Sequence, residues 1–192
     1  MEETGELFLI RHAPVAEPGR LYGRTDVDAE LDPDAIAPLA ARLQDVAVIL
    51  TSPAQRCRQT AEALWPERIG IAADDRLWEQ DFGAHDGMAY ADLPDLGPLS
   101  KQELADYAPP EGESFRDVIA RVTPAIEAAC QVAVGQKMAL VVHAGVIRAV
   151  LGLTLGHGPA ALAFDIAPLS LSRFRFTRSG PSAIHSVGEI FR

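Results

Sequence analysis

The sequence has little cysteine and comparatively few basic residues. Its two cysteines, Cys57 and Cys130, lie far apart in a chain of 192 residues. They are too few for the disulfide framework of a small secreted domain. Lysine and arginine total 17 against 27 aspartates and glutamates, which gives a net charge of -10. An acidic protein lacks the basic face that nucleic acids require, so we expect no nucleic-acid partner. A small anionic substrate is still compatible with a locally basic site.

Signals for secretion or membrane insertion are also missing. The sequence opens with Met-Glu-Glu-Thr-Gly-Glu, which is acidic where a signal peptide carries positive charge. No apolar run approaches the roughly 20 residues of a membrane-spanning helix. We therefore expect a cytoplasmic protein with no membrane partner, and the sequence leaves its oligomeric state open.

What the sequence does contain is an alternation of short apolar runs with helical stretches. Three continuous runs are typical of strands buried on both faces of a sheet: residues 7–10, 47–50 and 138–142. Two antiparallel strands are expected at 169–177 and 183–191, around a turn at 179–181. We predict a single domain over residues 1–192 with a three-layer α/β/α sandwich. Its sheet is mainly parallel, with an antiparallel hairpin at the C-terminal edge.

Two helices have recognisable start signals. Ser52 is predicted to be an N-cap, with Gln55 completing a capping box. A second helix is predicted to begin at Ser114, where Asp117 stands at the matching position three residues later. Pro124 falls inside the apolar pattern of this second helix and is predicted to kink or interrupt it.

Polar residues follow three of the predicted strands at the point where each strand ends. Arg11 and His12 follow the first, Arg56 comes shortly after the second, and His143 follows the third. Each residue alone has an ordinary explanation, such as a solvated arginine or a histidine bonded to nearby backbone. Ligand sites in open α/β sheets form outside the carboxyl ends of the strands. Together, these residues therefore predict a binding site at one edge of the sheet.

Five ordered segments resemble the histidine phosphatase (phosphoglycerate mutase-like) superfamily. They are Leu-Ile-Arg-His at 9–12, Ser-Pro-Ala-Gln-Arg-Cys-Arg-Gln-Thr-Ala at 52–61, Leu-Trp-Glu-Gln-Asp-Phe-Gly at 77–83, Glu-Gly-Glu-Ser-Phe at 111–115 and Val-Val-His-Ala-Gly-Val-Ile-Arg at 141–148. The resemblance covers most of the chain. It implies a phosphomonoesterase that acts on a small phosphorylated metabolite.

The resemblance also implies a role for each charged residue. His12 would accept the phosphoryl group, while Arg11, Arg56 and His143 would bind its oxygens. Guanidinium groups are permanently charged and match the geometry of phosphate oxygens. An imidazole with an ordinary pKa of about 6.5 is accessible in its neutral, nucleophilic form. Because these donors can neutralise the phosphoryl oxygens, we expect no metal ion and no cofactor.

Glu79 is implied to protonate the leaving oxygen and later to deprotonate the attacking water. Asp81 and Asp86 lie close in sequence and are alternatives for this role. The chain also departs from the family pattern, since Ala13 and Ala144 stand where glycine is usual. Their methyl groups are expected near the phosphate, with Ala144 in contact with substrate.

The segment 19–26 resembles the early loop of α-ribazole phosphatases, which implies α-ribazole 5′-phosphate as the substrate. Tyr22, Gly23 and Arg24 would then meet the organic part of that substrate. Two alternatives stay open. One is a phosphotransferase of the phosphoglycerate mutase type, against which the short segment 88–110 argues because it leaves little chain for a closing lid. The other is a non-catalytic relative that binds phosphorylated ligands.

Overall fold

The computed structural model describes residues 3–191 and contains a six-stranded mixed sheet. Its strands are β1 (Gly5–Arg11), β2 (Val48–Thr51), β3 (Ala72–Ala73), β4 (Lys137–Val142), β5 (Leu171–Thr177) and β6 (Gly180–Glu189). Their order across the sheet is β3-β2-β4-β1-β5-β6. The first four strands run parallel, while β5 and β6 pair antiparallel. The predicted C-terminal hairpin is confirmed, although Gly180 already belongs to β6 and not to the turn.

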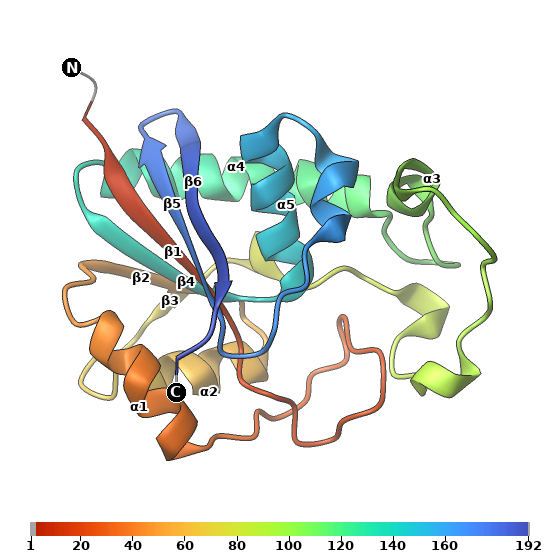
Figure 1. Ribbon diagram of the computed structural model, residues 1–192. Helices are drawn as coiled ribbons and strands as arrows, with labels where there is room; N and C mark the ends of the chain where they lie inside the picture. The colour runs from red at the N-terminus through yellow and green to blue at the C-terminus, as the bar shows by residue number, and fades with distance from the viewer. Residues whose placement is uncertain (1–2, 192) are drawn as a thin grey trace.

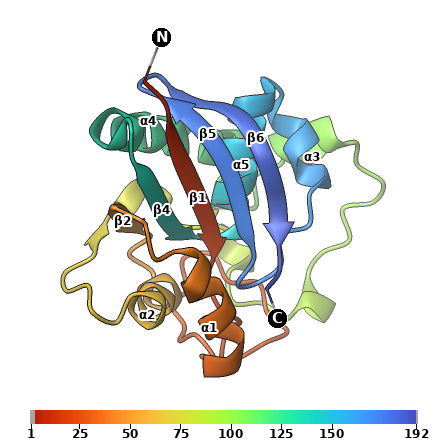
Figure 2. The ribbon, with the colours of Figure 1, turned by 60° about the vertical axis from the view of Figure 1, so that its left-hand side comes forward.

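Helices cover both faces of this sheet. They are α1 (Pro33–Arg42), α2 (Gln55–Leu64), α3 (Lys101–Asp106), α4 (Phe115–Ala133) and α5 (Ala144–Leu155). Helices α1 and α2 lie on one face and α4 and α5 on the other, as the two views show (Figures 1 and 2). The predicted three-layer α/β/α sandwich is therefore confirmed. In the part of the chain that the structure describes, no helix has both the length and the apolar character needed to cross a bilayer.

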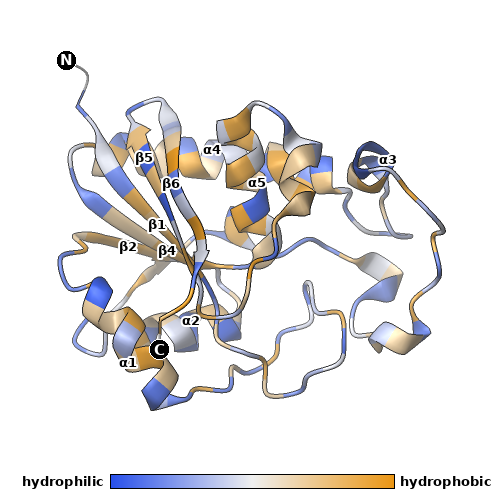
Figure 3. Ribbon diagram, in the orientation of Figure 1, coloured by the Kyte–Doolittle hydropathy of each residue, from blue (hydrophilic) through white to orange (hydrophobic). Residues whose placement is uncertain are grey.

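The central strands bury side chains on both faces. Leu7 and Leu9 of β1 enter the core beneath α4 and α5, whereas Phe8 and Ile10 enter the core against α1 and α2. Successive side chains of a strand point to opposite faces, so a continuous apolar run fills both cores at once. Figure 3 shows apolar stretches along the strands and along α5. The rigid, doubly covered sheet fixes the strand ends that carry the polar residues.

The start of α4 is as predicted, but its interior is not. The Ser114 hydroxyl oxygen accepts a bond from the Asp117 amide, and the Asp117 carboxylate accepts one from the Ser114 amide. The prediction that Pro124 interrupts the helix was wrong, because α4 continues through it to Ala133. Pro124 and Ala120 are both exposed. The Ala120 carbonyl that loses its partner to proline can therefore bond to water.

The start of α2 differs from its prediction. The helix begins at Gln55 with Ala54 as N-cap, and no side chain caps it. Ser52 lies ahead of the helix, and a hydrogen bond of 2.8 Å joins its hydroxyl oxygen to His143 Nε2. The predicted capping role of Ser52 was wrong because the helix begins two residues later than expected; the Ser52 hydroxyl oxygen accepts from the amide of the N-cap residue Ala54 at 3.3 Å and not from an amide inside the helix.

Candidate active site

The ends of β1, β2 and β4 bring the predicted polar residues together. Arg11 is the last residue of β1 and pairs in register with Val142, the last residue of β4. The next residues along these two strands are His12 and His143, so their side chains meet. The two imidazole rings lie edge to face, with centroids 5.2 Å apart and an angle of 67° between their planes.

His12 is held as a neutral imidazole. Its side chain is 5% exposed, and Nδ1 lies 2.7 Å from the carbonyl oxygen of Ala13. Because a carbonyl can only accept, Nδ1 carries the proton and Nε2 keeps its lone pair. Burial, together with the positive charges of Arg56 and Arg11, lowers the pKa of His12 to about 3. The free Nε2 is thus available as a nucleophile across the neutral and mildly acidic range.

His143 is fully buried and is fixed from several sides. Ser52 bonds its Nε2, and the Cys57 sulfur lies 3.5 Å from the same nitrogen. The Trp78 ring stacks on the imidazole, with centroids 6.4 Å apart and planes 8° from parallel. Burial and the nearby Arg56 lower the pKa of His143 well below its usual value. Burial also raises the pKa of the Cys57 thiol, so this neighbour stays protonated.

Two guanidinium groups border the histidines without a carboxylate partner. Arg56 is 1% exposed and donates to the carbonyl oxygens of Gly23 at 2.9 Å and Thr25 at 3.2 Å. Arg11 donates to the carbonyl oxygen of Ile166, while its buried Nε has no partner. Across residues 3–191, no carboxylate lies within 4.0 Å of either group. Buried charge needs compensation, so this pocket is complementary to an anion.

Glu79 lies beside these side chains, and its carboxylate contacts the amino end of α5. Its carboxylate is 9% exposed and accepts hydrogen bonds from the Gly145 amide at 3.1 and 3.3 Å. The Gln80 amide donates a further bond at 3.0 Å. A Cβ at position 145 would lie 2.2 Å from a Glu79 carboxylate oxygen, so any larger residue there would push this carboxylate away from the amide. A carboxylate next to a helix amino end is electrostatically favoured.

The two rival carboxylates are engaged in loop structure. Asp86 accepts from three consecutive amides of residues 23–25, at 3.1, 2.6 and 3.2 Å. Asp81 accepts from the Gly83 amide at 2.8 Å. Asp86 therefore ties the early loop, residues 19–26, to the loop 77–86 that holds the three candidate carboxylates (the acid-bearing loop), and Asp81 closes a turn. Of the three candidates, Glu79 is the one whose carboxylate is bonded to an amide of α5, the helix that follows His143.

The early loop, residues 19–26, contacts residues of the site. Gly23 supplies a carbonyl oxygen to Arg56, and a Cβ there would lie 2.2 Å from the Gln80 carbonyl oxygen. The Arg24 guanidinium lies 5.6 Å from the centroid of the Trp78 ring. Tyr22 is half-buried, and no hydrogen bond or aromatic stack within residues 3–191 joins it to either histidine. Of the predicted substrate-binding loop, Gly23 thus contacts Arg56, and Arg24 lies against the Trp78 ring that stacks on His143.

The two alanines fit the backbone without strain. Among residues 3–191, the non-glycine residues with positive φ are Glu111 and Leu169, so Ala13 and Ala144 are not among them. The Ala13 amide donates to the Thr60 hydroxyl oxygen at 2.9 Å, and Ala144 begins α5. Of these two strained residues, Leu169 lies next to the site, and its amide donates to the Arg11 carbonyl oxygen at 3.1 Å.

The structure also reveals supporting residues that the sequence analysis did not assign. Arg121 of α4 donates to the carbonyl oxygens of Trp78 at 3.1 Å and Glu79 at 3.3 Å. The same guanidinium pairs with the Glu113 carboxylate at 2.8 Å. It thereby holds the acid-bearing loop against α4. The sequence signal for Arg121 was its position in the helix next to Val122, which is buried. An arginine near the core is unusual unless its charge is bonded.

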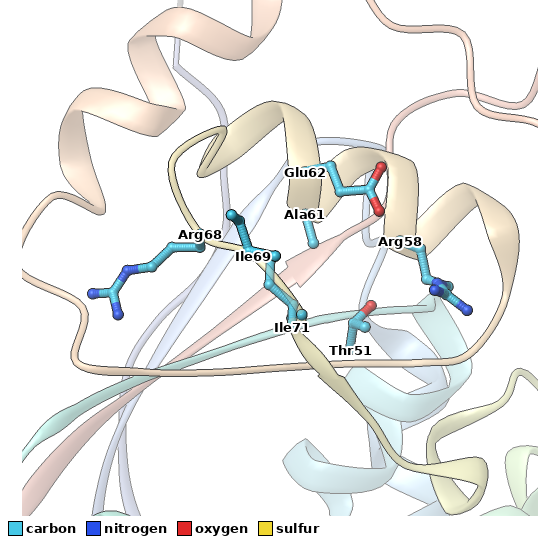
Figure 4. A pocket seen from close by; sticks show the side chains of 8 residues that line it. Thr51, Arg58, Ala61, Glu62, Arg68, Ile69 and Ile71 are labelled. Carbon is cyan, nitrogen blue, oxygen red and sulfur yellow. The ribbon is translucent and has the colours of Figure 1, made fainter.

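A separate cavity of about 270 Å³ lies beside α2 and contains none of the predicted site residues (Figure 4). Arg58 and Arg68 stand on opposite sides of it, with Ile69 and Ile71 between them. The two charges therefore do not converge on one point. Within the described residues 3–191, no group of three or more histidine, cysteine, aspartate or glutamate side chains is arranged to hold a metal ion.

Comparison with known proteins agrees with this geometry. The bifunctional protein Rv2228c of Mycobacterium tuberculosis is 31% identical over 196 residues, which is 95% of this chain and 53% of that protein. The chain thus spans about half the length of the curated relatives that it matches.

Two solved structures share the fold. Bacillus stearothermophilus YhfR superposes with a TM-score of 0.84 at 22% identity, covering 97% of this chain and 98% of that one. The mycobacterial glucosyl-3-phosphoglycerate phosphatase Rv2419c gives 0.83 at 23% identity, covering 96% and 99%. The family model for the histidine phosphatase superfamily, branch 1, matches residues 7–187. The chain therefore belongs to the histidine phosphatase superfamily.

Proposed function

We propose that this chain is a phosphomonoesterase that acts through a phosphohistidine on His12 and requires no metal ion. One observation carries the proposal. A neutral imidazole with a free Nε2 lies among two guanidinium groups that lack carboxylate partners. A nucleophile beside guanidinium groups that have no paired carboxylate suits phosphoryl transfer, in which negative charge is spread over three equatorial oxygens. Family membership, and the phosphatase named among its structural neighbours, support the same reaction class.

The reaction has two steps. In the first, His12 Nε2 forms a bond to phosphorus while the bond from phosphorus to the ester oxygen breaks. Glu79 donates its proton to the departing alcohol oxygen. In the second, water attacks phosphorus, the P–N bond breaks, and the Glu79 carboxylate takes the proton from water. Arg11, Arg56 and His143 hold the phosphoryl oxygens throughout.

The His12→Ala variant is expected to lose phosphatase activity by at least about a thousandfold, because no other side chain replaces its nucleophilic nitrogen. Acid-labile ³²P label should be trapped on the wild-type chain during turnover and be absent from the variant. The exposed His185, on β6, provides a control as His185→Ala, which should retain both label and activity. Substantial turnover by His12→Ala would reject the assignment. A wild-type chain that binds phosphate but never takes up label would favour the non-catalytic alternative.

Replacing Glu79 with glutamine should slow the release of poor leaving groups more than that of good ones. An aryl oxide departs with little protonation, whereas an alkoxide needs a proton from the general acid. We expect kcat/KM to fall by about tenfold for p-nitrophenyl phosphate and by about a thousandfold for a sugar phosphate. Asp81→Asn serves as the matched change in the same loop. Equal losses for both substrates in Glu79→Gln would remove the general-acid role from this residue.

The neutral state of His12 should also make the free energy of unfolding depend on pH. The unfolded chain binds a proton at this residue near pH 6.5, but the folded chain does so only near its lowered pKa of about 3. Unfolded molecules therefore hold more protons between these values. His12 then makes the folded state less stable as pH falls from about 6.5 towards 3, by up to about 1.4 kcal/mol per pH unit.

Urea unfolding of wild type and His12→Asn at several pH values between 7.5 and 5 measures this contribution. The difference in free energy of unfolding should move in favour of His12→Asn as pH falls. His185→Asn should track the wild type, because that ring meets water before and after unfolding. Parallel curves for wild type and His12→Asn would contradict a buried, neutral His12.

For the substrate, we favour α-ribazole 5′-phosphate, supported by the resemblance of segment 19–26. Hydrolysis is favoured over a mutase reaction because segment 88–110 is short and mostly exposed, which leaves water free to reach the phosphohistidine. We expect the highest kcat/KM for α-ribazole 5′-phosphate in a panel with 3-phosphoglycerate and several sugar phosphates. Rapid interconversion of phosphoglycerates would instead indicate a mutase. Equal efficiency on all esters would reject only the α-ribazole assignment.

A further inference from the structure

An apolar cavity of about 270 Å³ lies between the acid-bearing loop and the segment 88–110. Its apolar lining includes Leu21, Phe82, Leu96, Leu104, Phe115 and Leu162. The polar groups among its lining residues are Gln80, His85, Tyr107 and Arg148, and no carboxylate is among them. The volume is slightly below the roughly 300–1,000 Å³ of typical small-molecule pockets. It is sufficient for one or two fused rings.

The cavity lies next to residues that support the proposed catalytic side chains, which are not themselves part of its lining. Gln80 follows Glu79 directly, and Leu21 belongs to the loop whose Gly23 carbonyl bonds Arg56. Arg148 lies one turn beyond the start of α5, where the Gly145 amide holds Glu79. Arg148 donates to the carbonyl oxygen of Phe164 at 2.9 Å, and Arg11 donates to that of Ile166, two residues further along the chain. An ester whose phosphate meets Arg11 would therefore place its alcohol portion next to this cavity.

The rim of the cavity leaves apolar surface exposed to water. Leu96 is 38% exposed and Leu104 is 41% exposed. Covering such surface with an apolar group is favourable in proportion to the area removed from water. A polyhydroxy chain would instead lose hydrogen bonds to water against these side chains without regaining them.

We infer that this cavity binds the alcohol portion of the substrate, and that the preferred substrates are phosphate monoesters of bulky apolar or aromatic alcohols. The inference rests on the proposed phosphatase function, because it assumes that the phosphate lies against His12 and the two arginines. Segment 88–110 then selects the substrate by apolar contact, and the catalytic pocket recognises the phosphate.

The test compares two esters with similar leaving groups, phenyl phosphate and 2-naphthyl phosphate. We expect the wild type to prefer 2-naphthyl phosphate by about tenfold in kcat/KM, since the second ring adds apolar contact. Leu104→Asp places a charge at the rim, and the ratio of the two kcat/KM values should fall to about one. Leu155→Asp is the matched control, because Leu155 is similarly exposed, at 46%, at the far end of α5. That control should keep the wild-type ratio.

The outcomes separate the two proposals. Activity on both esters without a preference for the second ring, or a ratio unchanged in Leu104→Asp, would overturn the inference and leave the phosphatase function intact. An equal fall of the ratio in both aspartate variants would also overturn it, because the effect would then be one of general charge. A wild type that hydrolyses neither ester, nor any phosphate in the panel above, would reject the proposed function and this inference together.

Discussion

The buried guanidinium of Arg56 is the constraint on which the other parts of the site depend. Removing such a charge from water costs several kcal/mol unless polar groups surround it. Here the compensation comes from the carbonyl oxygens of Gly23 and Thr25, and their loop is held in place by the Asp86 carboxylate. Carbonyl groups stabilise the cation without cancelling its charge. Burial, together with the positive potential that remains, lowers the pKa of His12 and keeps it neutral, and the same potential favours an anion.

Local patterns predicted the scaffold well because they act within short stretches of chain. The apolar runs of β1 and β4 alternate between two cores, and the Ser114 capping box forms where its spacing indicated. Ser52 shows where such prediction fails. Its hydroxyl group accepts from the nearby Ala54 amide, but it is also bonded to the imidazole of His143 beyond the end of β4. A sequence pattern identifies the first partner but contains no information on the second.

The same limit applies to the choice among the three candidate general acids. Glu79, Asp81 and Asp86 stand within one short loop, and their spacing gave no basis for choosing among them. What distinguishes Glu79 is an amide from another part of the chain, that of Gly145 on α5. Arg121 also acts on this loop from a distance, through carbonyl oxygens that any sequence would provide. Contacts with backbone groups leave no compositional trace, so only the folded chain reveals them.

The position of β1 has a consequence for how the chain acquires its structure. It is a central strand whose neighbours are β4 and β5, and its register pairs Glu6 with Lys137. At a synthesis rate of about 5–20 residues per second, Lys137 of β4 is therefore added roughly 7 to 26 s after Glu6 of β1. Through that interval an apolar strand has both of its edges unpaired, which is the condition that favours association between nascent chains. The strand that carries His12 at its end is thus open to such association until β4 has been made.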